Sequence, residues 1–238
     1  MKEYWLDTQN RSLMGQYLTS VESSFIYKCL QSTENTHSVL DIGGGTGRFA
    51  IPLKEKGVNV TVIEVQAAPL WWLKTKNSSI HSILISPQIR VWPIKDSCMD
   101  CILAIQIPHL GTDWFWQECH RVLRANGSVI MCSSNSHSYK GLLHKIRPLL
   151  KPFVMKRGKW AYSNFYGMSA KSLVKTMERN NFRVESALGY NWLPTTRDSN
   201  FPLIPFLGTV EKRLSLKENF TFQSPWVLFQ ARANAITQ

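Results

Sequence analysis

Three glycines spaced two residues apart, Gly43, Gly45 and Gly47, follow an apolar run that contains one acid, Asp41. Glycine lets the backbone bend sharply and lets a ligand come close, because it has no side chain. A helix that begins after the glycines would point its free N–H groups and its positive dipole end at the space above the turn. The spacing therefore predicts a strand, a turn and a helix that hold a nucleoside-bearing ligand.

Two acids bear on the nature of that ligand. Residues 45–50 match the dinucleotide pattern G-x-G-x-x-G/A, and Glu64 follows at about the usual distance of 20 residues. Asp41, however, stands before the glycines, where a carboxylate would repel a pyrophosphate and attract an ammonium or sulfonium group. Glu64 ends an expected strand over residues 58–65, and its carboxylate can accept hydrogen bonds from the ribose hydroxyls of an adenosine.

The full pattern, Asp41-x-Gly43-x-Gly45-x-Gly47, resembles motif I of the class I S-adenosylmethionine-dependent methyltransferases. Residues 88–100 are similar to the stretch G-D-A-x-x-L-P-F-x-D-x-S-F-D of that family, and residues 118–127 to E-x-x-R-V-L-K-P-G-G. Within the family, the chain looks like the small-molecule enzymes of the methyltransferase type 11 and ubiquinone–menaquinone kind. The resemblance covers residues 38–133 well and the rest by the order of elements.

The resemblance implies an α/β fold: a doubly wound, Rossmann-like sheet of seven strands in the order 3-2-1-4-5-7-6, with strand 7 antiparallel. We expect residues 1–238 to form a single methyltransferase domain. Its parts would be an N-terminal cap helix region over 1–37, a cofactor-binding core over 38–135, and a substrate-side half over 136–238. An insertion over 191–223, rich in Pro, Phe and Leu, is long enough to roof a pocket.

The elements along the chain can be placed from their patterns. Apolar residues at helical spacing predict a helix over 10–30, and the apolar run after residue 100 predicts a buried parallel strand over 101–107. Asn126-Gly127 predicts a tight turn before a fifth strand over 128–133. Ser169 is the expected N-cap of a helix that ends at Asn180-Asn181.

The resemblance also implies which residues bind S-adenosylmethionine. Gln88 stands where the family usually has an acid that contacts the adenine, and its amide oxygen can still accept a hydrogen bond. The expected cofactor-binding residues are Asp41, Gly43, Gly45, Gly47, Glu64, Gln88, Gln106 and Tyr17. His109, after the fourth strand, is the candidate general base for a hydroxyl acceptor, and His137, after the fifth, is the second candidate.

Composition limits the class of protein. The chain has 238 residues, and neither an apolar run of 18 residues nor an apolar N-terminal stretch is present. We therefore expect a cytoplasmic protein. Its five cysteines are scattered and odd in number, which argues against a disulfide framework. Cys98 and Cys101 have C-x-x-C spacing without a second pair, so we interpret them as buried structural thiols and expect no metal site.

Most of the net charge of +12 lies in one segment, because residues 140–183 hold 11 Lys and Arg against one acid. Leu142, Leu143 and Ile146 can share a helical face, with Lys140 and other basic residues on its rim. That composition is typical of a helix on a membrane surface. We expect an anionic or lipid-linked acceptor, or peripheral contact of residues 140–160 with an anionic membrane at the inner surface. RNA or an acidic protein would be attracted by the same positive charge.

The sequence thus favours an S-adenosylmethionine-dependent methyltransferase that acts on the oxygen or nitrogen of a small-molecule, lipid-linked or glycan-type acceptor. An RNA methyltransferase is an alternative, although Gln106-Ile107-Pro108-His109 lacks the motifs of base-amine and cytosine-C5 enzymes. A nicotinamide-dependent oxidoreductase would leave Asp41 unexplained. A cofactor-binding protein without turnover is the non-enzymatic alternative.

Overall fold

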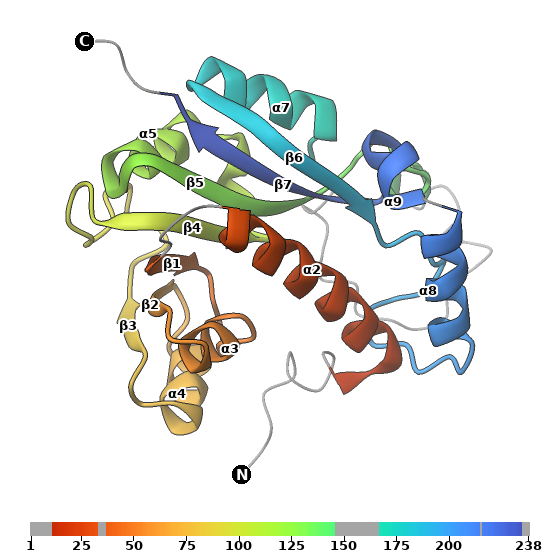
Figure 1. Cartoon of the computed structure of the whole chain (residues 1–238), viewed down its shortest axis with the longest axis horizontal. Coiled ribbons are helices and arrows are strands. Elements are labelled where there is room, and N and C mark those ends of the chain that lie inside the picture. The colour runs from red at the N-terminus through yellow and green to blue at the C-terminus, as the bar shows by residue number, and fades with distance from the viewer. Residues whose placement is uncertain (1–10, 33–36, 146–166, 215, 235–238) are drawn as a thin grey trace.

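A seven-stranded sheet forms the centre of the molecule (Figure 1). The computed structural model describes residues 11–32, 37–145, 167–214 and 216–234. The strand order is β3-β2-β1-β4-β5-β7-β6. Strands β1 (Ser38–Ile42), β2 (Asn59–Glu64), β3 (His81–Leu84), β4 (Met99–Ile105) and β5 (Leu123–Ser134) are parallel, whereas β7 (Trp226–Ala233) runs antiparallel between β5 and β6 (Phe182–Tyr190). The predicted order and the antiparallel seventh strand are confirmed.

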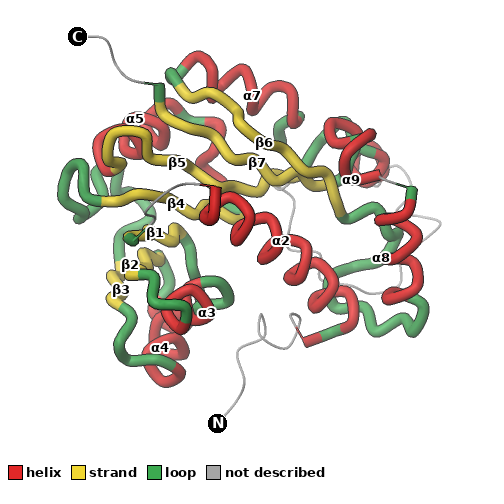
Figure 2. Tube along the Cα trace, in the orientation of Figure 1, coloured by secondary structure: helices red, strands yellow, loops and turns green. Residues whose placement is uncertain are grey.

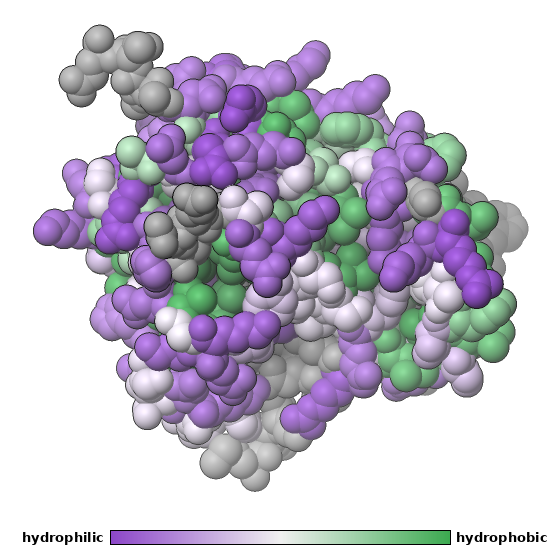
Figure 3. All heavy atoms as spheres, viewed as in Figure 1, coloured by the Kyte–Doolittle hydropathy of each residue, from purple (hydrophilic) through white to green (hydrophobic). Residues whose placement is uncertain are grey.

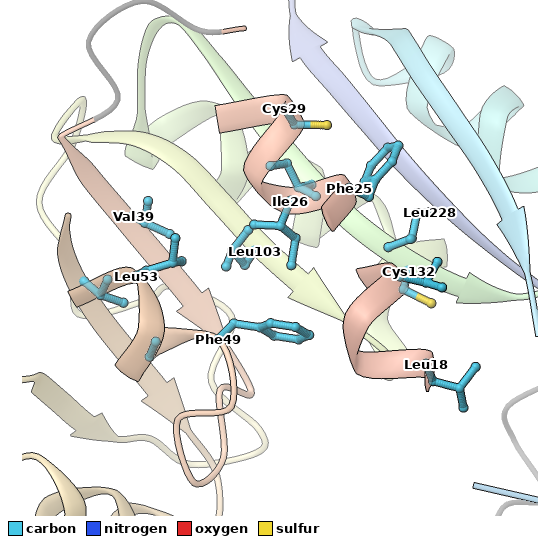
Figure 4. Close-up of a cluster of buried hydrophobic side chains, with 14 of the residues drawn as sticks. Leu18, Phe25, Ile26, Cys29, Val39, Phe49, Leu53, Leu103, Cys132 and Leu228 are labelled. Carbon is cyan, nitrogen blue, oxygen red and sulfur yellow. The ribbon is translucent and has the colours of Figure 1, made fainter. Parts of the chain in front are cut away.

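Helices cover both faces of this sheet, as the tube in Figure 2 shows. One face packs against α2 (Leu13–Ser32), α3 (Ala50–Glu55) and α4 (Ala67–Lys76), and the other against α5 (Asp113–Val122) and α7 (Ala170–Arg179). The strands alternate between the two cores, so that Val39 joins the first core and Leu40 the second. Figure 4 shows Leu18, Phe25 and Ile26 of α2 in the first core with Leu103 of β4 and Leu228 of β7.

The insertion after β6 contains α8 (Ile204–Arg213), α9 (Leu216–Asn219) and the short helix η2 (Thr221–Gln223). Because β6 is antiparallel to β7, it runs in the same direction as β1 and β4. The insertion therefore starts at the edge of the sheet where the parallel strands end, and Figure 1 shows α8 and α9 together on that side. The carboxyl ends of parallel strands are where such sheets bind ligands.

Two local expectations need correction. Strand β5 begins at Leu123 and not at residue 128, because Leu123 pairs with Met99 before the register shifts. Asn126 does adopt the left-handed conformation that the turn requires, with φ of 64°, but it lies within this irregular strand. The buried side chains of the N-terminal helix α2 form a layer of the core, and its role as a cap of the site stays a prediction.

Large apolar side chains are exposed on the insertion. Figure 3 shows apolar surface at the side of the molecule where Figure 1 places α8, next to hydrophilic surface. The exposed residues of this stretch are Phe201, Leu203, Phe206, Leu214, Phe220 and Phe222. Among the described helices, none is long and apolar enough to cross a bilayer.

Candidate functional site

The glycine turn follows β1 directly and adopts the conformation that its residue types predict. Gly43, Gly45 and Gly47 have φ values of 67°, 56° and 86°. These values lie in the left-handed region, which other residues adopt only at a cost. A Cβ on Gly47 would lie 2.5 Å from Leu73 Cδ1, whereas a Cβ on Gly45 would meet nothing closer than a carbonyl oxygen at 3.9 Å. Gly47 therefore packs against α4, and Gly45 leaves space for a ligand.

Asp41 lies beneath this turn as a buried carboxylate. Its side chain is 2% exposed, and its Oδ2 atom has no hydrogen-bond partner among the described residues. Burial raises the pKa of Asp41 to about 7, Glu64 adds to the rise, and the nearby Arg48 opposes it. An unpaired buried acceptor of this kind is rare in folded proteins and marks a place for a donor or a cation.

Gly44 lies against the side chain of Asp41, although the sequence pattern allows any residue at position 44. A Cβ on Gly44 would lie 2.6 Å from Asp41 Oδ2 and 3.0 Å from Val62 Cγ1. The carboxylate thus rests against the backbone of the turn, and only glycine leaves room for it. The run of three glycines from residue 43 to 45 was the available signal, but the contact itself depends on the side-chain direction of Asp41.

Glu64 ends β2 and is buried, with 8% of its surface exposed. Its Oε1 atom accepts hydrogen bonds from the backbone N–H groups of Val65, at 2.7 Å, and Gln66, at 3.1 Å. One carboxylate oxygen is therefore used to fix the side chain at the strand end. The other is the one that can meet a ribose hydroxyl.

The chain after β4 returns to the glycine turn. A Cβ on Gly43 would lie 3.2 Å from Ile107 Cγ2, so the two segments are in contact. Gln106 adopts a φ of 61°, and its buried Nε2 atom has no hydrogen-bond partner within the part of the chain that is described. Gln106 thus offers an unused donor at the end of the strand next to Asp41's own strand.

His109 lies in the short helix η1 (Pro108–Gly111), two residues beyond Ile107. Its ring centroid is 5.1 Å from that of Trp114, and the Arg90 guanidinium lies 4.8 Å from the same Trp114 ring. Partial burial lowers the pKa of His109, and the charge of Arg90 lowers it further. The imidazole is therefore neutral at pH 7 and able to accept a proton.

A buried network that the sequence analysis did not identify joins α2 to the turn. Glu22 is fully buried, and its carboxylate pairs with Arg48, which follows Gly47, and with Arg197 at 3.5 Å. The Tyr190 hydroxyl donates to Glu22 Oε1 at 2.7 Å. An acid within an apolar helical stripe was the available signal, but its partners lie far away in sequence.

The E-x-x-R part of the resemblance has a structural role. Arg121 pairs with Glu118 and donates to the backbone oxygens of Trp92, at 2.9 Å, and Ile94, at 2.8 Å. Glu118 in turn accepts from the Trp92 N–H at 2.7 Å. The pair therefore fastens the loop between β3 and β4 onto α5. The acid of that loop, Asp96, accepts from the same Arg121 at 2.5 Å.

Of the three other predicted site residues, two are exposed and one packs against α8. Gln88 is exposed, and its Oε1 atom accepts a hydrogen bond from the Ser86 hydroxyl. His137 is exposed, and its backbone N–H donates to Asn135 Oδ1 at 3.2 Å. Tyr17 packs against α8 at Gly208, where a Cβ would lie 2.7 Å from the ring. Their roles toward a ligand stay predictions.

Of the predicted membrane helix, only residues 139–145 belong to the described structure, and they are helical. Leu142 and Leu143 are 59% and 51% exposed. Lys140 is not on an exposed rim, because its Nζ atom donates to Asn191 Oδ1 at 2.8 Å and to the Thr195 carbonyl at 3.3 Å. Burial lowers the pKa of Lys140 to about 8. Residues 146–160 lie outside the described residues, so contact with a membrane or an anionic acceptor stays a prediction.

The two cysteines of the C-x-x-C spacing, Cys98 and Cys101, differ in burial. Cys101 is buried in β4, and burial raises its pKa to about 12. Cys98 is partly exposed, and its Sγ atom donates to the Lys95 carbonyl at 2.9 Å. The prediction of two buried thiols is therefore wrong for Cys98, because it precedes β4 in a surface loop. Within the described ranges, no three His, Cys, Asp or Glu side chains are close enough together to hold a metal ion.

The glycine turn, its acid and the strands around it match a known family. Residues 39–127 match the family model described as a methyltransferase domain. Residues 39–127 are therefore a methyltransferase domain, and the strand order is the one expected for the class I S-adenosylmethionine-dependent enzymes. The match covers the whole path from β1 to the start of β5, including the turn, Glu64 and His109. The finer likeness to one small-molecule subgroup stays a prediction.

Solved structures of other proteins share the fold of this methyltransferase. A protein from Thermotoga maritima, described as a possible histamine N-methyltransferase, superposes with a TM-score of 0.60 at 17% identity, over 97% of this chain and 93% of that one. A geranyl diphosphate C-methyltransferase from Streptomyces coelicolor has a TM-score of 0.58 at 14% identity, over 92% and 82%. A [4+2]-cyclase has a TM-score of 0.58 at 14% identity, over 92% and 81%. Searching the curated proteins found no match.

The site of the methyltransferase suits its cofactor, S-adenosylmethionine. Asp41 offers an unpaired buried oxygen to a cation, and Gly45 leaves the approach open. Gln106 offers an unpaired donor from the neighbouring strand. Glu64 stands at the end of β2 with one oxygen already held by the backbone. Cation, hydroxyl and acceptor groups of the cofactor therefore each have a complementary group in this chain.

Proposed function

We propose that this methyltransferase modifies a hydroxyl or amine group of a small-molecule, lipid-linked or glycan-type acceptor. The observation that carries the proposal is the place of His109 on the segment that touches the glycine turn through Ile107, where burial lowers the pKa of the imidazole. A hydroxyl or protonated amine must lose a proton in the reaction, and a neutral imidazole is suited to take it.

S-adenosylmethionine, when bound, supplies a methyl group on a sulfonium that is already a good leaving group. The protein then needs chiefly to orient the reactants and exclude water. Asp41 would attract the cationic end of the cofactor, and Glu64 would accept a hydrogen bond from its ribose. Trp114 packs against one side of the His109 ring, and burial together with the charge of Arg90 keeps the pKa of His109 low. The acceptor proton leaves to the imidazole and from there to solvent.

A titration of the whole chain with S-adenosylmethionine by calorimetry, followed by mass analysis of reactions with acceptor pools, tests the proposal. We expect binding of the cofactor and a product heavier by one methyl group. Pools of saccharides, lipid-linked intermediates, amines and RNA should be tried separately. Binding of NAD in its place, or methyl gain in RNA alone, would contradict the proposed acceptor class.

A further inference from the structure

Buried polar atoms without hydrogen bonds surround Glu211 of α8. The Glu211 side chain is 2% exposed, and neither carboxylate oxygen has a hydrogen-bond partner among the described residues. The same holds for the Tyr17 hydroxyl, the Trp192 ring N–H and the Thr195 hydroxyl. Buried polar groups in native proteins are normally paired with protein, water or a ligand. Five such atoms in one region therefore need an explanation.

These residues belong to one neighbourhood, which we call the Glu211 cluster: Tyr17, Lys140, Trp192, Thr195, Glu211 and Lys217. Tyr17 packs against α8 at Gly208, and the Lys217 Nζ atom lies 5.3 Å from the centre of its ring. The Lys140 Nζ atom donates a hydrogen bond to the Thr195 carbonyl oxygen. Burial lowers the pKa of Lys140, and the charge of Glu211 partly offsets that effect. Burial raises the pKa of Tyr17, and the charge of Glu211 raises it further. The Glu211 carboxylate lies near the Tyr17 hydroxyl and the Trp192 backbone N–H, but neither contact has the geometry of a hydrogen bond.

The Glu211 cluster lies on the acceptor side of the domain. Trp192 follows the end of β6 by two residues, at the edge of the sheet that carries the glycine turn. The hydroxyl of Tyr190, the last residue of β6, donates a hydrogen bond to Glu22. Glu22 in turn forms a salt bridge with Arg48, the residue after Gly47. A continuous set of contacts therefore runs from the cofactor turn to the start of the insertion. The rings of Tyr139 and Trp192 stack with centroids 6.2 Å apart beside it.

The unpaired atoms define what the cluster can bind. The two oxygens of Glu211 need donors, whereas the Trp192 N–H needs an acceptor. A cationic ligand would suit Glu211 but would meet the charges of Lys140 and Lys217. An anionic ligand would suit the lysines but would meet Glu211 in a region where charges are poorly screened. Hydroxyl groups both donate and accept, so a neutral ligand with several hydroxyls can satisfy both kinds of atom.

We infer that the Glu211 cluster binds a neutral polyhydroxyl group, such as a saccharide ring, of the methyl acceptor. The inference rests on the proposed function in one respect: the polyhydroxyl group is taken to be part of the methyl acceptor. Glu211 accepts from two hydroxyls, and Trp192 and Tyr17 donate to ring or hydroxyl oxygens. The stacked aromatic rings give the ligand an apolar wall.

Ligand-observed NMR on the full chain tests the inference with three probes of one scaffold: D-glucose, D-glucosamine and D-glucose 6-phosphate. These probes are neutral, cationic and anionic. We expect glucose to bind at least five times more tightly than either charged probe. Glu211→Gln keeps the shape but removes the charge, and Tyr17→Phe removes only a hydroxyl. Each variant should weaken glucose binding about fivefold or more. Glu218→Gln, at an exposed acid of α9, is the matched control and should change nothing.

Binding of S-adenosylmethionine by the same proteins separates this inference from the proposed function. Glu211→Gln and the control Glu218→Gln should bind the cofactor as the native chain does. The inference is overturned if native protein that binds the cofactor does not bind glucose. It is also overturned if the charged probes bind more tightly, or if Glu211→Gln and Tyr17→Phe bind glucose like the native chain, since the unpaired atoms would then hold only water. Glucose binding without any methyl transfer would contradict the proposed function and leave the cluster as a saccharide site.

Discussion

The backbone of Gly44 lies directly against the carboxylate of Asp41, so that a Cβ at residue 44 would stand 2.6 Å from Oδ2. Gly44→Ala must therefore displace this carboxylate. We expect a stability loss of about 1 to 3 kcal/mol, as for other overpacked sites, together with weaker binding of S-adenosylmethionine. Calorimetry and thermal unfolding measure both effects.

Gly57→Ala is the control for Gly44→Ala. Gly57 has a φ of 85°, but a Cβ there would meet nothing within 4 Å. This variant should lose about 1 to 2 kcal/mol through backbone strain and bind the cofactor normally. Native cofactor affinity in Gly44→Ala would show that the position of the Asp41 carboxylate does not matter.

Asp41 should make cofactor binding depend on pH. Because burial raises its pKa to about 7, the carboxyl group is largely neutral at pH 6 and charged at pH 8. A cationic ligand favours the charged form, so affinity should rise about tenfold from pH 6 to pH 8. Calorimetry at several pH values tests this. An Asp41→Asn variant should bind more weakly and lose this pH dependence.

The same pKa predicts the opposite effect on stability. Between the ordinary pKa of Asp and about 7, folded Asp41 holds a proton that the unfolded chain has lost. Its contribution to stability is therefore largest at low pH and falls as pH rises toward 7, by up to about 4 kcal/mol. Asp41→Asn should consequently unfold at a higher temperature than the native chain at pH 8. A lower unfolding temperature at that pH would contradict the burial of an unpaired charge.

Glu64→Ala should weaken cofactor binding by about 1.5 to 3 kcal/mol for each charged hydrogen bond lost. Part of the effect will come from the N–H groups of Val65 and Gln66, which lose their acceptor. Glu64→Gln keeps an acceptor for these groups and should lose less. Glu55→Ala, at an exposed acid of α3, is the control. Equal affinity in all three variants would remove Glu64 from the site.

His109→Gln tests the general base. For a hydroxyl acceptor we expect kcat to fall by about 10² to 10⁴, with little change in cofactor affinity. The acid limb of the pH profile should disappear, because the imidazole must be neutral to accept a proton. If His109 is the base, His137→Gln should keep kcat, whereas a comparable fall in His137→Gln would assign the role to this second candidate. An unchanged pH profile in His109→Gln would assign His109 to lining the site.

Arg121→Lys tests the fastening of the loop between β3 and β4. Lysine cannot reproduce the several hydrogen bonds of Arg121 to Glu118, Trp92 and Ile94. We expect a loss of several kcal/mol in unfolding free energy, at about 1.5 to 3 kcal/mol for each bond lost. Arg179→Lys is matched, because Arg179 pairs with Asp113 at 2.6 Å on the exposed surface. It should cost less than about 1 kcal/mol.

The sequence predicts the features that depend on local patterns. Apolar runs that end in glycine or asparagine marked β1, the turn and the end of α7, and Ser169 caps that helix by accepting from the Ser172 N–H at 3.1 Å. The resemblance supplied the strand order. The positions of Lys140 and Glu22 were not predictable, because each depends on partners from distant segments.

Glu22 has a consequence for how the protein is made. Its carboxylate meets a tyrosine that lies 168 residues later and an arginine that lies 175 residues later. Contacts between such distant segments form slowly, since a long loop must close first. On the ribosome, the glycine turn would be synthesised long before the groups that hold Arg48 and α2 in place. We therefore expect nascent chains to acquire cofactor affinity only after β6 and the insertion have emerged.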